Sequence, residues 1–143
     1  MLKASNQAVD LIKQSEGRQL KAYRCPAGTI TIGYGHTKGV YEGQEINDTM
    51  ALEMLWQDVK TIDLQLSKVN LKVNQNQYDA LVSFVFNLGF GNFLKSTLFD
   101  KVTSNPNDPT IRDEFMKWRY AAHRELPGLV KRRKAEADLY FKK

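Results

Sequence analysis

Residues 16–37 read EGRQLKAYRCPAGTITIGYGHT, and the fold prediction starts from this stretch because its hydrophobic period differs from that of the flanking segments. Two short runs, Leu20–Cys25 and Thr29–Tyr34, are rich in residues that favour β-strands. Between them, Pro26-Ala27-Gly28 is typical of a hairpin turn. Further glycines follow at positions 33, 35, 39 and 43. The stretch therefore predicts a small, irregular β-hairpin lobe with little side-chain bulk.

Amphipathic helices are predicted on both sides of this lobe. Residues 7–16 carry apolar side chains at helical spacing, and Gly17 follows as a stop signal. After the lobe, spacings of 3, 4, 3 and 4 separate the apolar residues Leu52, Leu55, Val59, Ile62 and Leu66. This face predicts a long helix over about 48–68, capped by Asn47 or Asp48. A helix of about 20 residues spans roughly 30 Å, which is enough to join two lobes.

A buried central helix is predicted next. Asn74 and Gln77 form a capping pattern, and the segment that follows is apolar on nearly every side until Gly89. A second helix is expected near residues 93–102.

The last third of the chain predicts two more helices. Asp108-Pro109 reads as a cap and first turn after the loop at 105–109. The helical face that follows consists of Ile111, Phe115, Trp118 and Ala122. Pro127-Gly128 interrupts the chain before a final, basic amphipathic helix.

These elements predict an α+β fold made of a single domain over residues 1–143. A small hairpin lobe at about 17–46 connects through the long helix at about 48–68 to a mainly helical lobe. That lobe takes in residues 74–143 and the N-terminal helix. Such a layout leaves a cleft between the lobes, and binding sites form preferentially at such interfaces.

Composition limits the function classes. The 143 residues are 42% hydrophobic and 26% charged, as in an ordinary globular domain. The net charge is +5, and residues 131–143, with six basic and two acidic residues, supply +4 of it. A dedicated nucleic-acid binder usually carries basic residues over a whole face, so no nucleic-acid partner is expected. The basic last helix could contact an anionic envelope, although a packed helix with a solvated basic face is the favoured interpretation.

The sequence also bears on compartment. Cys25 is the single cysteine, which excludes an internal disulfide framework. Residues 1–7 lack the apolar core of a signal peptide, and no stretch has the length of a transmembrane span. We therefore expect a monomer that stays in the cytoplasm where it is made, without a metal ion or another cofactor.

Glu16 is the candidate catalytic acid. It ends the first predicted helix just before the hairpin, where its carboxyl would face the cleft. Cleavage of a glycosidic bond needs a proton for the leaving oxygen and a second group that guides water or attacks carbon. Burial at a lobe interface keeps such a carboxyl neutral near neutral pH. A glutamate taken alone is more often a solvated helix end, so the neighbouring residues decide between the two.

Those neighbours form a specific pattern. Glu16 is followed after eight residues by Cys25 and after five more by Thr31, which opens the run Thr31-Ile32-Gly33-Tyr34-Gly35-His36. This segment resembles the active site of the phage-type lysozymes, the glycoside hydrolase 24 family, where the same spacings run into T-I-G-x-G-H. Residues 82–89 and 126–136 are similar to two further segments of that family. The resemblance covers essentially the whole chain and implies a lysozyme-like fold with an active-site cleft.

The resemblance implies catalytic roles residue by residue. Glu16 matches the general acid, and Thr31 matches the residue that helps to hold the catalytic water. Cys25 takes the position that is Asp or Cys in the family. The family is regarded as inverting, so a water molecule attacks on the face opposite the acid.

The same resemblance assigns a structural role to the turn after the second strand. Gly33, Gly35 and His36 belong to it, and the equivalent histidine is usually paired with an acid on the long helix. Asp58 and Asp63 are both candidates for that acid.

The role of Cys25 has two interpretations. An unperturbed thiol titrates near pH 8.5 and is mostly protonated at pH 7, so we expect Cys25 to position water with Thr31. A thiolate base or nucleophile is the alternative; Arg24 could favour it, although strand alternation points Arg24 to the other face. A thiol-protease pair of Cys25 with His36 is disfavoured because no protease signature surrounds the cysteine.

Four residues are candidates for saccharide binding, because aromatic faces stack on sugar rings and polar groups bind hydroxyl and acetamido groups. They are Tyr34, Ser83, Phe86 and Asn87. Core packing is an equal alternative for Phe86, and Trp118 is expected in the core.

The resemblance implies an endolysin, a muramidase that hydrolyses the β-1,4 bond between N-acetylmuramic acid and N-acetylglucosamine in peptidoglycan. It would be made in an infected or lysogenic bacterium, release progeny phage, and depend on a holin-like membrane permeabiliser. One alternative is a cationic wall-binding protein that acts without catalysis. Another is a small nucleic-acid binder, which predicts a steep salt dependence of DNA affinity.

Overall fold

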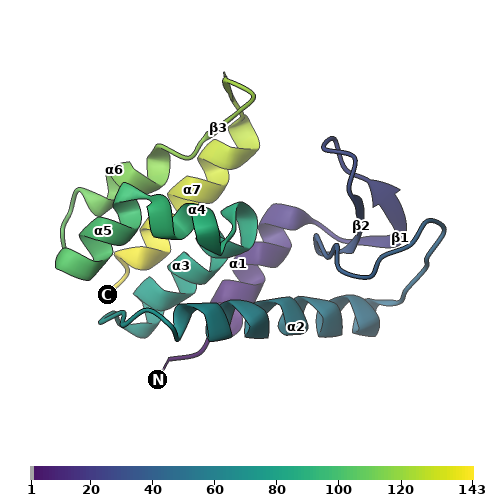
Figure 1. The fold of residues 1–143 in the computed structure, drawn as a ribbon, viewed down its shortest axis with the longest axis horizontal. Coiled ribbons are helices and arrows are strands. Elements are labelled where there is room, and N and C mark those ends of the chain that lie inside the picture. Colours follow the sequence, from purple (N-terminus) through teal and green to yellow (C-terminus); the bar gives the residue numbers. More distant parts are fainter. Residues whose placement is uncertain (1) are drawn as a thin grey trace.

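The computed structural model describes residues 2–143, and Figure 1 shows how its elements are arranged. In chain order they are α1 (Asn6–Glu16), β1 (Gln19–Arg24), β2 (Ile30–Gly33), α2 (Asp48–Leu66), α3 (Gln75–Leu88), α4 (Phe90–Lys95), α5 (Thr97–Ser104), α6 (Ile111–Met116), β3 (Tyr120–Ala121), β4 (Arg124–Glu125) and α7 (Pro127–Tyr140). The β1–β2 lobe lies over the N-terminal end of α2, and the other helices gather around its opposite half (Figure 1). The predicted α+β layout is therefore confirmed.

The small lobe is an antiparallel hairpin, as predicted. β1 and β2 pair with Tyr23 opposite Thr31, and the backbone N–H of Cys25 donates to the carbonyl of Thr29 (3.0 Å). Ile32, Ile46 and Ala51 form a small core beneath it. Ala51 belongs to α2, so the long helix closes this core from below.

α2 joins the two lobes, and Asn47 is its cap: the Asn47 side chain accepts from the backbone N–H of Met50 (2.8 Å). The buried face of the helix consists of Ala51, Leu55, Val59, Ile62 and Leu66. Leu52 was predicted on this face, but it is 38% exposed. The face begins one residue earlier, at Ala51, which packs with Ile32 and Ile46 in the core of the small lobe.

α3 is the buried central helix, as predicted. Asn74 and Gln77 form a reciprocal capping box at its start. Every residue from Gln77 to Val85 is buried, and α1, α2 and α7 all pack against this helix.

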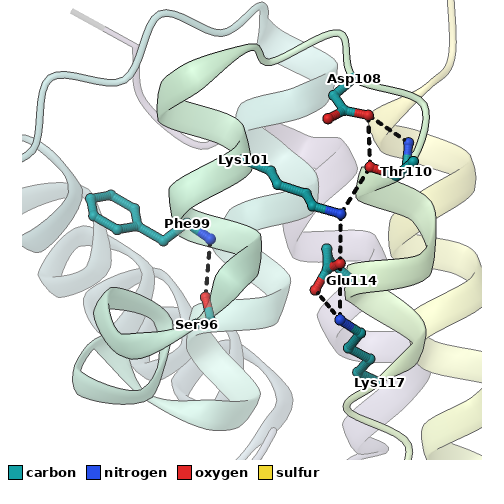
Figure 2. A network of polar contacts seen from close by, with 7 residues as sticks. All are labelled: Ser96, Phe99, Lys101, Asp108, Thr110, Glu114 and Lys117. Atoms are coloured by element: carbon teal, nitrogen blue, oxygen red, sulfur yellow. Dashed lines mark hydrogen bonds and ion pairs between the residues drawn. The ribbon is translucent and has the colours of Figure 1, made fainter.

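The segment predicted as one helix near residues 93–102 is two helices. α4 and α5 meet at Ser96, whose hydroxyl accepts from the backbone N–H of Phe99 (3.1 Å; Figure 2). Such a side-chain cap starts a new helix, which explains the break.

The start of α6 also differs from the prediction. Asp108 accepts from the backbone N–H of Thr110 (2.8 Å) in a turn, and the helix begins at Ile111 rather than at Pro109. Ile111 and Phe115 are buried as expected.

A second hairpin, β3–β4, was not predicted. It lies between α6 and α7, and both residues of its turn, Ala122 and His123, have positive φ (51° and 64°). Ala122 was predicted on a helical face but is exposed in this turn. Trp118 lies after the end of α6 and packs edge-on against Phe84, with 5.7 Å between the ring centroids. It is partly buried and packs against the main core.

α7 corrects the predicted basic, solvated face. Pro127 is its first residue rather than a break before it. Lys131 and Lys134 are exposed, whereas Arg132 and Arg133 are buried. No helix within residues 2–143 is long and apolar enough to cross a membrane.

Candidate active site

Glu16 is the last residue of α1, and Gly17 ends the helix with φ +70°. The side chain of Glu16 is 23% exposed, and its Oε2 accepts from Nη1 of Arg132 on α7 at 2.5 Å. Its other oxygen, Oε1, lies next to Gly35: a Cβ added at Gly35 would stand 2.8 Å from it. The glutamate is therefore held between the last helix and the turn after β2.

Gly35 is the point of close approach in this arrangement. Its φ is +77°, a conformation that residues with a side chain rarely adopt, and an added Cβ would also meet Cε1 of Phe86 at 3.5 Å. Phe86, near the end of α3, thus lies beside the same turn as Glu16. The position requires glycine both for its backbone and for the space that Glu16 occupies.

Cys25 and Thr31 lie together on the hairpin. Thr31 is buried, and its hydroxyl donates to the carbonyl of Thr29 (3.1 Å). Partial burial acts to raise the pKa of Cys25, but hydrogen bonds with the backbone of Ala27 and Thr29 and with the hydroxyls of Thr31 and Thr29 outweigh it and lower that pKa. Arg24 is engaged elsewhere, since its Nη1 donates to the carbonyl of Gly28 (3.1 Å). The thiolate is therefore favoured by hydrogen bonds.

Tyr23 is a residue near this site that sequence reasoning missed. Burial, followed by the negative charges of Glu16 and Cys25, raises the pKa of its phenol. The phenol is thus close enough to both groups to sense their charges. Alternation along a strand places Tyr23 and Cys25 on one face, which is the signal that could have found it.

His36 connects the turn to α2. Its Nδ1 lies 2.8 Å from Oδ2 of Asp58, and its backbone N–H donates to the carbonyl of Ile32 (2.9 Å). Asp58 is therefore the acid partner of His36. The other candidate, Asp63, accepts instead from the hydroxyl of Tyr78 (2.6 Å) and from the backbone N–H of Ala4 (3.0 Å).

The four candidate saccharide-binding residues occupy different surroundings. Tyr34 is half-buried, with the Lys13 ammonium 5.6 Å from its ring centroid, and Phe86 lies beside Gly35. Asn87 accepts from Nη2 of Arg133 (2.8 Å).

Ser83 is a correction to the saccharide-binding set. Its side chain is fully buried, and its hydroxyl donates to Oε2 of Glu136 (2.6 Å). It therefore supports the interior rather than a surface groove.

Arg132, Arg133 and Glu136 form a cluster on one face of α7, here called the α7 cluster. Nε of Arg132 lies 3.4 Å from Oε2 of Glu136, and Nε of Arg133 lies 2.9 Å from Oε1 of Glu136. All three residues are buried. The concentration of basic residues in the last helix suggested a packed helix with a solvated basic face, so the sequence argument missed this cluster.

The grouping of His, Cys, Asp and Glu side chains bears on metal binding. Within residues 2–143, no three His, Cys, Asp or Glu side chains are grouped so that they could hold a metal ion.

Comparisons with known proteins agree with the fold described above. The model of the phage lysozyme family matches residues 13–136. The endolysin of Acyrthosiphon pisum secondary endosymbiont phage 1 is 42% identical over 142 residues, covering 95% of this chain and 96% of that protein. The endolysin of Salmonella phage P22 is 34% identical over 147 residues and covers 99% of both chains.

A solved structure has the same lysozyme-like fold. The muramidase domain of SpmX from Asticaccaulis excentricus superposes with a TM-score of 0.89 at 32% identity, covering 100% of both chains. The fold, the match over residues 13–136 and the identity to phage endolysins lead to one conclusion: this chain belongs to the phage lysozyme family.

Proposed function

We propose that this protein is a phage endolysin that hydrolyses the β-1,4 bond between N-acetylmuramic acid and N-acetylglucosamine in peptidoglycan, with Glu16 as its general acid. The observation that carries the assignment of Glu16 is its environment. One carboxyl oxygen is bound by Arg132 and the other faces Gly35, with Phe86 beside the same turn. The carboxyl is fixed where the last turn of α1, the turn after β2 and the end of α3 meet, and it remains partly open to solvent.

The proposed reaction uses one proton and one water molecule. Glu16 protonates the leaving glycosidic oxygen as the bond from that oxygen to the anomeric carbon breaks, and a water bound by Thr31 and Cys25 attacks this carbon from the opposite face with inversion. The attacking water loses its surplus proton to solvent, or to Cys25 if its thiolate is the base, and Glu16 is reprotonated from solvent before the next turnover. The Thr31 hydroxyl has one proton, which it donates either to the Thr29 carbonyl or to Cys25, and in both cases its oxygen can accept from that water. Tyr34, Phe86 and Asn87 are proposed to contact the saccharide.

The experiment that tests this function is digestion of purified peptidoglycan followed by mass analysis of the fragments. The wild type should release fragments with new reducing muramic ends. Glu16→Gln should reduce the rate by about 10²–10⁴-fold, because the amide has no proton to donate in this role. Glu53→Gln, an exposed glutamate of α2, is the matched control and should keep full activity. Release of peptides, or undiminished lysis by Glu16→Gln, would refute the proposal and favour a non-catalytic cationic protein.

Three substitutions at Cys25 separate its possible roles. If Cys25 positions water, Cys25→Asp and Cys25→Ser should keep most of the activity, while Cys25→Ala should weaken it. If its thiolate is the base, Cys25→Ser should fall to the level of Cys25→Ala, because a serine hydroxyl does not ionise near neutral pH. Full activity of Cys25→Ala would remove the residue from the mechanism. Initial rates on peptidoglycan measure all three.

Delivery to the wall is part of the same proposal. Peptidoglycan lies outside the cytoplasmic membrane, so we propose that the protein accumulates in the host cytoplasm and needs a holin-like permeabiliser. Bacteria that express it should then grow until chloroform opens their membrane, and turbidity should fall at that moment. Lysis on expression alone would contradict this dependence.

A further inference from the structure

Arg132 lies between two carboxylates that belong to different parts of the fold. Its Nη1 donates to Glu16 at 2.5 Å, while its Nε lies 3.4 Å from Oε2 of Glu136. Its Nη2 also donates to the backbone carbonyl of Ser83 on α3 (3.3 Å). The arginine is therefore held from three directions, and only one of its partners is the proposed acid.

Glu136 is the best anchored member of the α7 cluster. It is fully buried, and besides Arg132 it contacts the Ser83 hydroxyl (2.6 Å) and two nitrogens of Arg133 (2.9 and 3.2 Å). Arg133 is fixed in turn by Asn87 and by the ring of Phe84, with its guanidinium 5.1 Å from the ring centroid. None of these partners is a mobile surface side chain, so Glu136 has little freedom to move.

Such charges are costly inside a protein. Burial raises the pKa of Glu136, an effect that Arg133 and Arg132 oppose, and burial lowers the pKa of Arg133. Well-packed apolar residues often stabilise a core as well as a buried ion pair does, so stability alone explains this cluster poorly. Arg132 links the cluster to Glu16. We therefore expect the benefit of the cluster at Glu16, the proposed acid, rather than in stability.

We propose that Glu136 is a positioning residue for Glu16: acting through Arg132, it fixes the acid against Gly35 and takes up part of the arginine's charge. An arginine with Glu16 as its sole carboxylate partner would favour the ionised, inactive form of the acid. Sharing that arginine with a second carboxylate weakens this attraction. The inference rests on the proposed role of Glu16.

The charged groups around Glu16 set the direction of the expected change. Tyr23 faces it from β1 near Cys25, Arg132 and Arg133 face it from α7, and Glu136 lies behind the arginines. Removal of the Glu136 charge leaves the positive groups in place and deletes one negative group. The ionised form of the acid is then stabilised, and the alkaline limb of the pH–rate profile should move to lower pH.

The test compares pH–rate profiles of the wild type, Glu136→Gln and the double variant R133M/E136Q on purified peptidoglycan. In Glu136→Gln the alkaline limb should move down by about one pH unit, equivalent to about tenfold in kcat/KM on that limb. In R133M/E136Q the shift should have the same direction but be smaller, because this variant also removes the positive charge of Arg133, which faces Glu16. KM should stay within about twofold, because the cluster does not touch substrate. The double variant removes both charges of the buried pair, so it should fold even where Glu136→Gln leaves Arg133 unpaired and unstable.

Glu114→Gln is the matched control. Glu114 is another buried carboxylate with two cationic partners, Lys101 and Lys117, but this network does not include Glu16 (Figure 2). Its profile should superpose on that of the wild type. Unmoved limbs in both Glu136 variants, or an equal shift in Glu114→Gln, would overturn the inference. Failure of the wild type to release muramic ends would instead overturn the proposed function.

Discussion

Two buried glutamates of the helical lobe, Glu136 on α7 and Glu114 on α6, each bind two cations, yet their surroundings differ. The partners of Glu136 are arginines, and the whole α7 cluster is buried. The partners of Glu114 are Lys101, at 2.7 Å and 29% exposed, and Lys117, at 2.8 Å and 62% exposed. Figure 2 shows the two lysines reaching Glu114 from opposite sides, one from α5 and one from the end of α6.

The difference lies in where each chain of contacts ends. The Glu114 network continues through Lys101 to the exposed Thr110 hydroxyl and the partly exposed Asp108, so water screens its charges. The α7 cluster continues through Arg132 to Glu16, with little water to screen it. Lysine carries its charge as a point on a flexible stem, whereas the planar fork of arginine binds several partners at once. The Glu114 network joins two helices. The α7 cluster contacts a candidate catalytic group and so contributes to its position and to the charge around it.

The largest expected effect is on stability at the α7 cluster. Glu136→Leu should lower the free energy of unfolding by about 3–5 kcal/mol, because it leaves buried arginine charge without compensation. Glu114→Leu should cost about 1–2 kcal/mol, since both lysines can turn into water. Urea unfolding monitored by circular dichroism measures both.

The pair replacement R133M/E136L sharpens this comparison. It removes both charges of the buried Arg133–Glu136 pair and leaves Arg132 with Glu16, so it should recover most of the loss caused by Glu136→Leu. Equal losses in the two single variants would show that burial does not distinguish the networks.

The next effect concerns the stability of the protein at acidic pH. Burial acts to raise the pKa of Glu114, but hydrogen bonds from Lys101 and Lys117 outweigh it and lower that pKa from its ordinary value of 4.5. A lowered folded-state pKa means that the stabilisation is present above pH 4.5 and is lost as the pH falls through the folded value. Glu114→Gln lacks this component, so the stability gap between it and the wild type should close below pH 4.5. A constant gap between pH 7 and pH 3 in urea unfolding would contradict the lowered pKa.

The smallest effect belongs to the most exposed cation. Lys117→Met should change the free energy of unfolding by less than about 1 kcal/mol, and the change should shrink further in 1 M salt. Thermal unfolding at low and high salt measures it. A larger, salt-independent loss would place Lys117 among the buried partners, together with Arg132 and Arg133.

Local signals in the sequence predicted much of the fold. The stop at Gly17, the turn at Pro26-Ala27-Gly28 and the capping box of Asn74 and Gln77 all depend on residues within a few positions of one another. Tertiary packing determined the features of the fold that these local signals did not predict. The buried face of α2 begins at Ala51, which packs with Ile32 and Ile46 under the hairpin, and Leu52 is exposed.

The second hairpin was missed for a local reason. Its turn residues Ala122 and His123 have positive φ without the glycine or asparagine that usually marks such a turn.

The candidate site was predictable only where it is local. The resemblance of residues 16–36 to the phage-type lysozymes indicated Glu16, Cys25 and Thr31, and the structure places the Thr31 hydroxyl close enough to Cys25 to lower the pKa of its thiol. The arginine that binds Glu16 is 116 residues away, so no pattern in a short window could reveal it. On composition alone Arg132 and Arg133 were part of a basic surface, because charged side chains are almost never fully buried without partners.

The separation of 116 residues between Glu16 and Arg132 has a consequence for how the enzyme forms. Contacts between distant segments lose the most chain entropy and tend to form late in folding. A chain whose middle helices are formed but whose first and last helices are undocked has no arginine at its proposed acid. Muramidase turnover would then report on completed folding, and refolding followed by turnover should lag behind refolding followed by helix content.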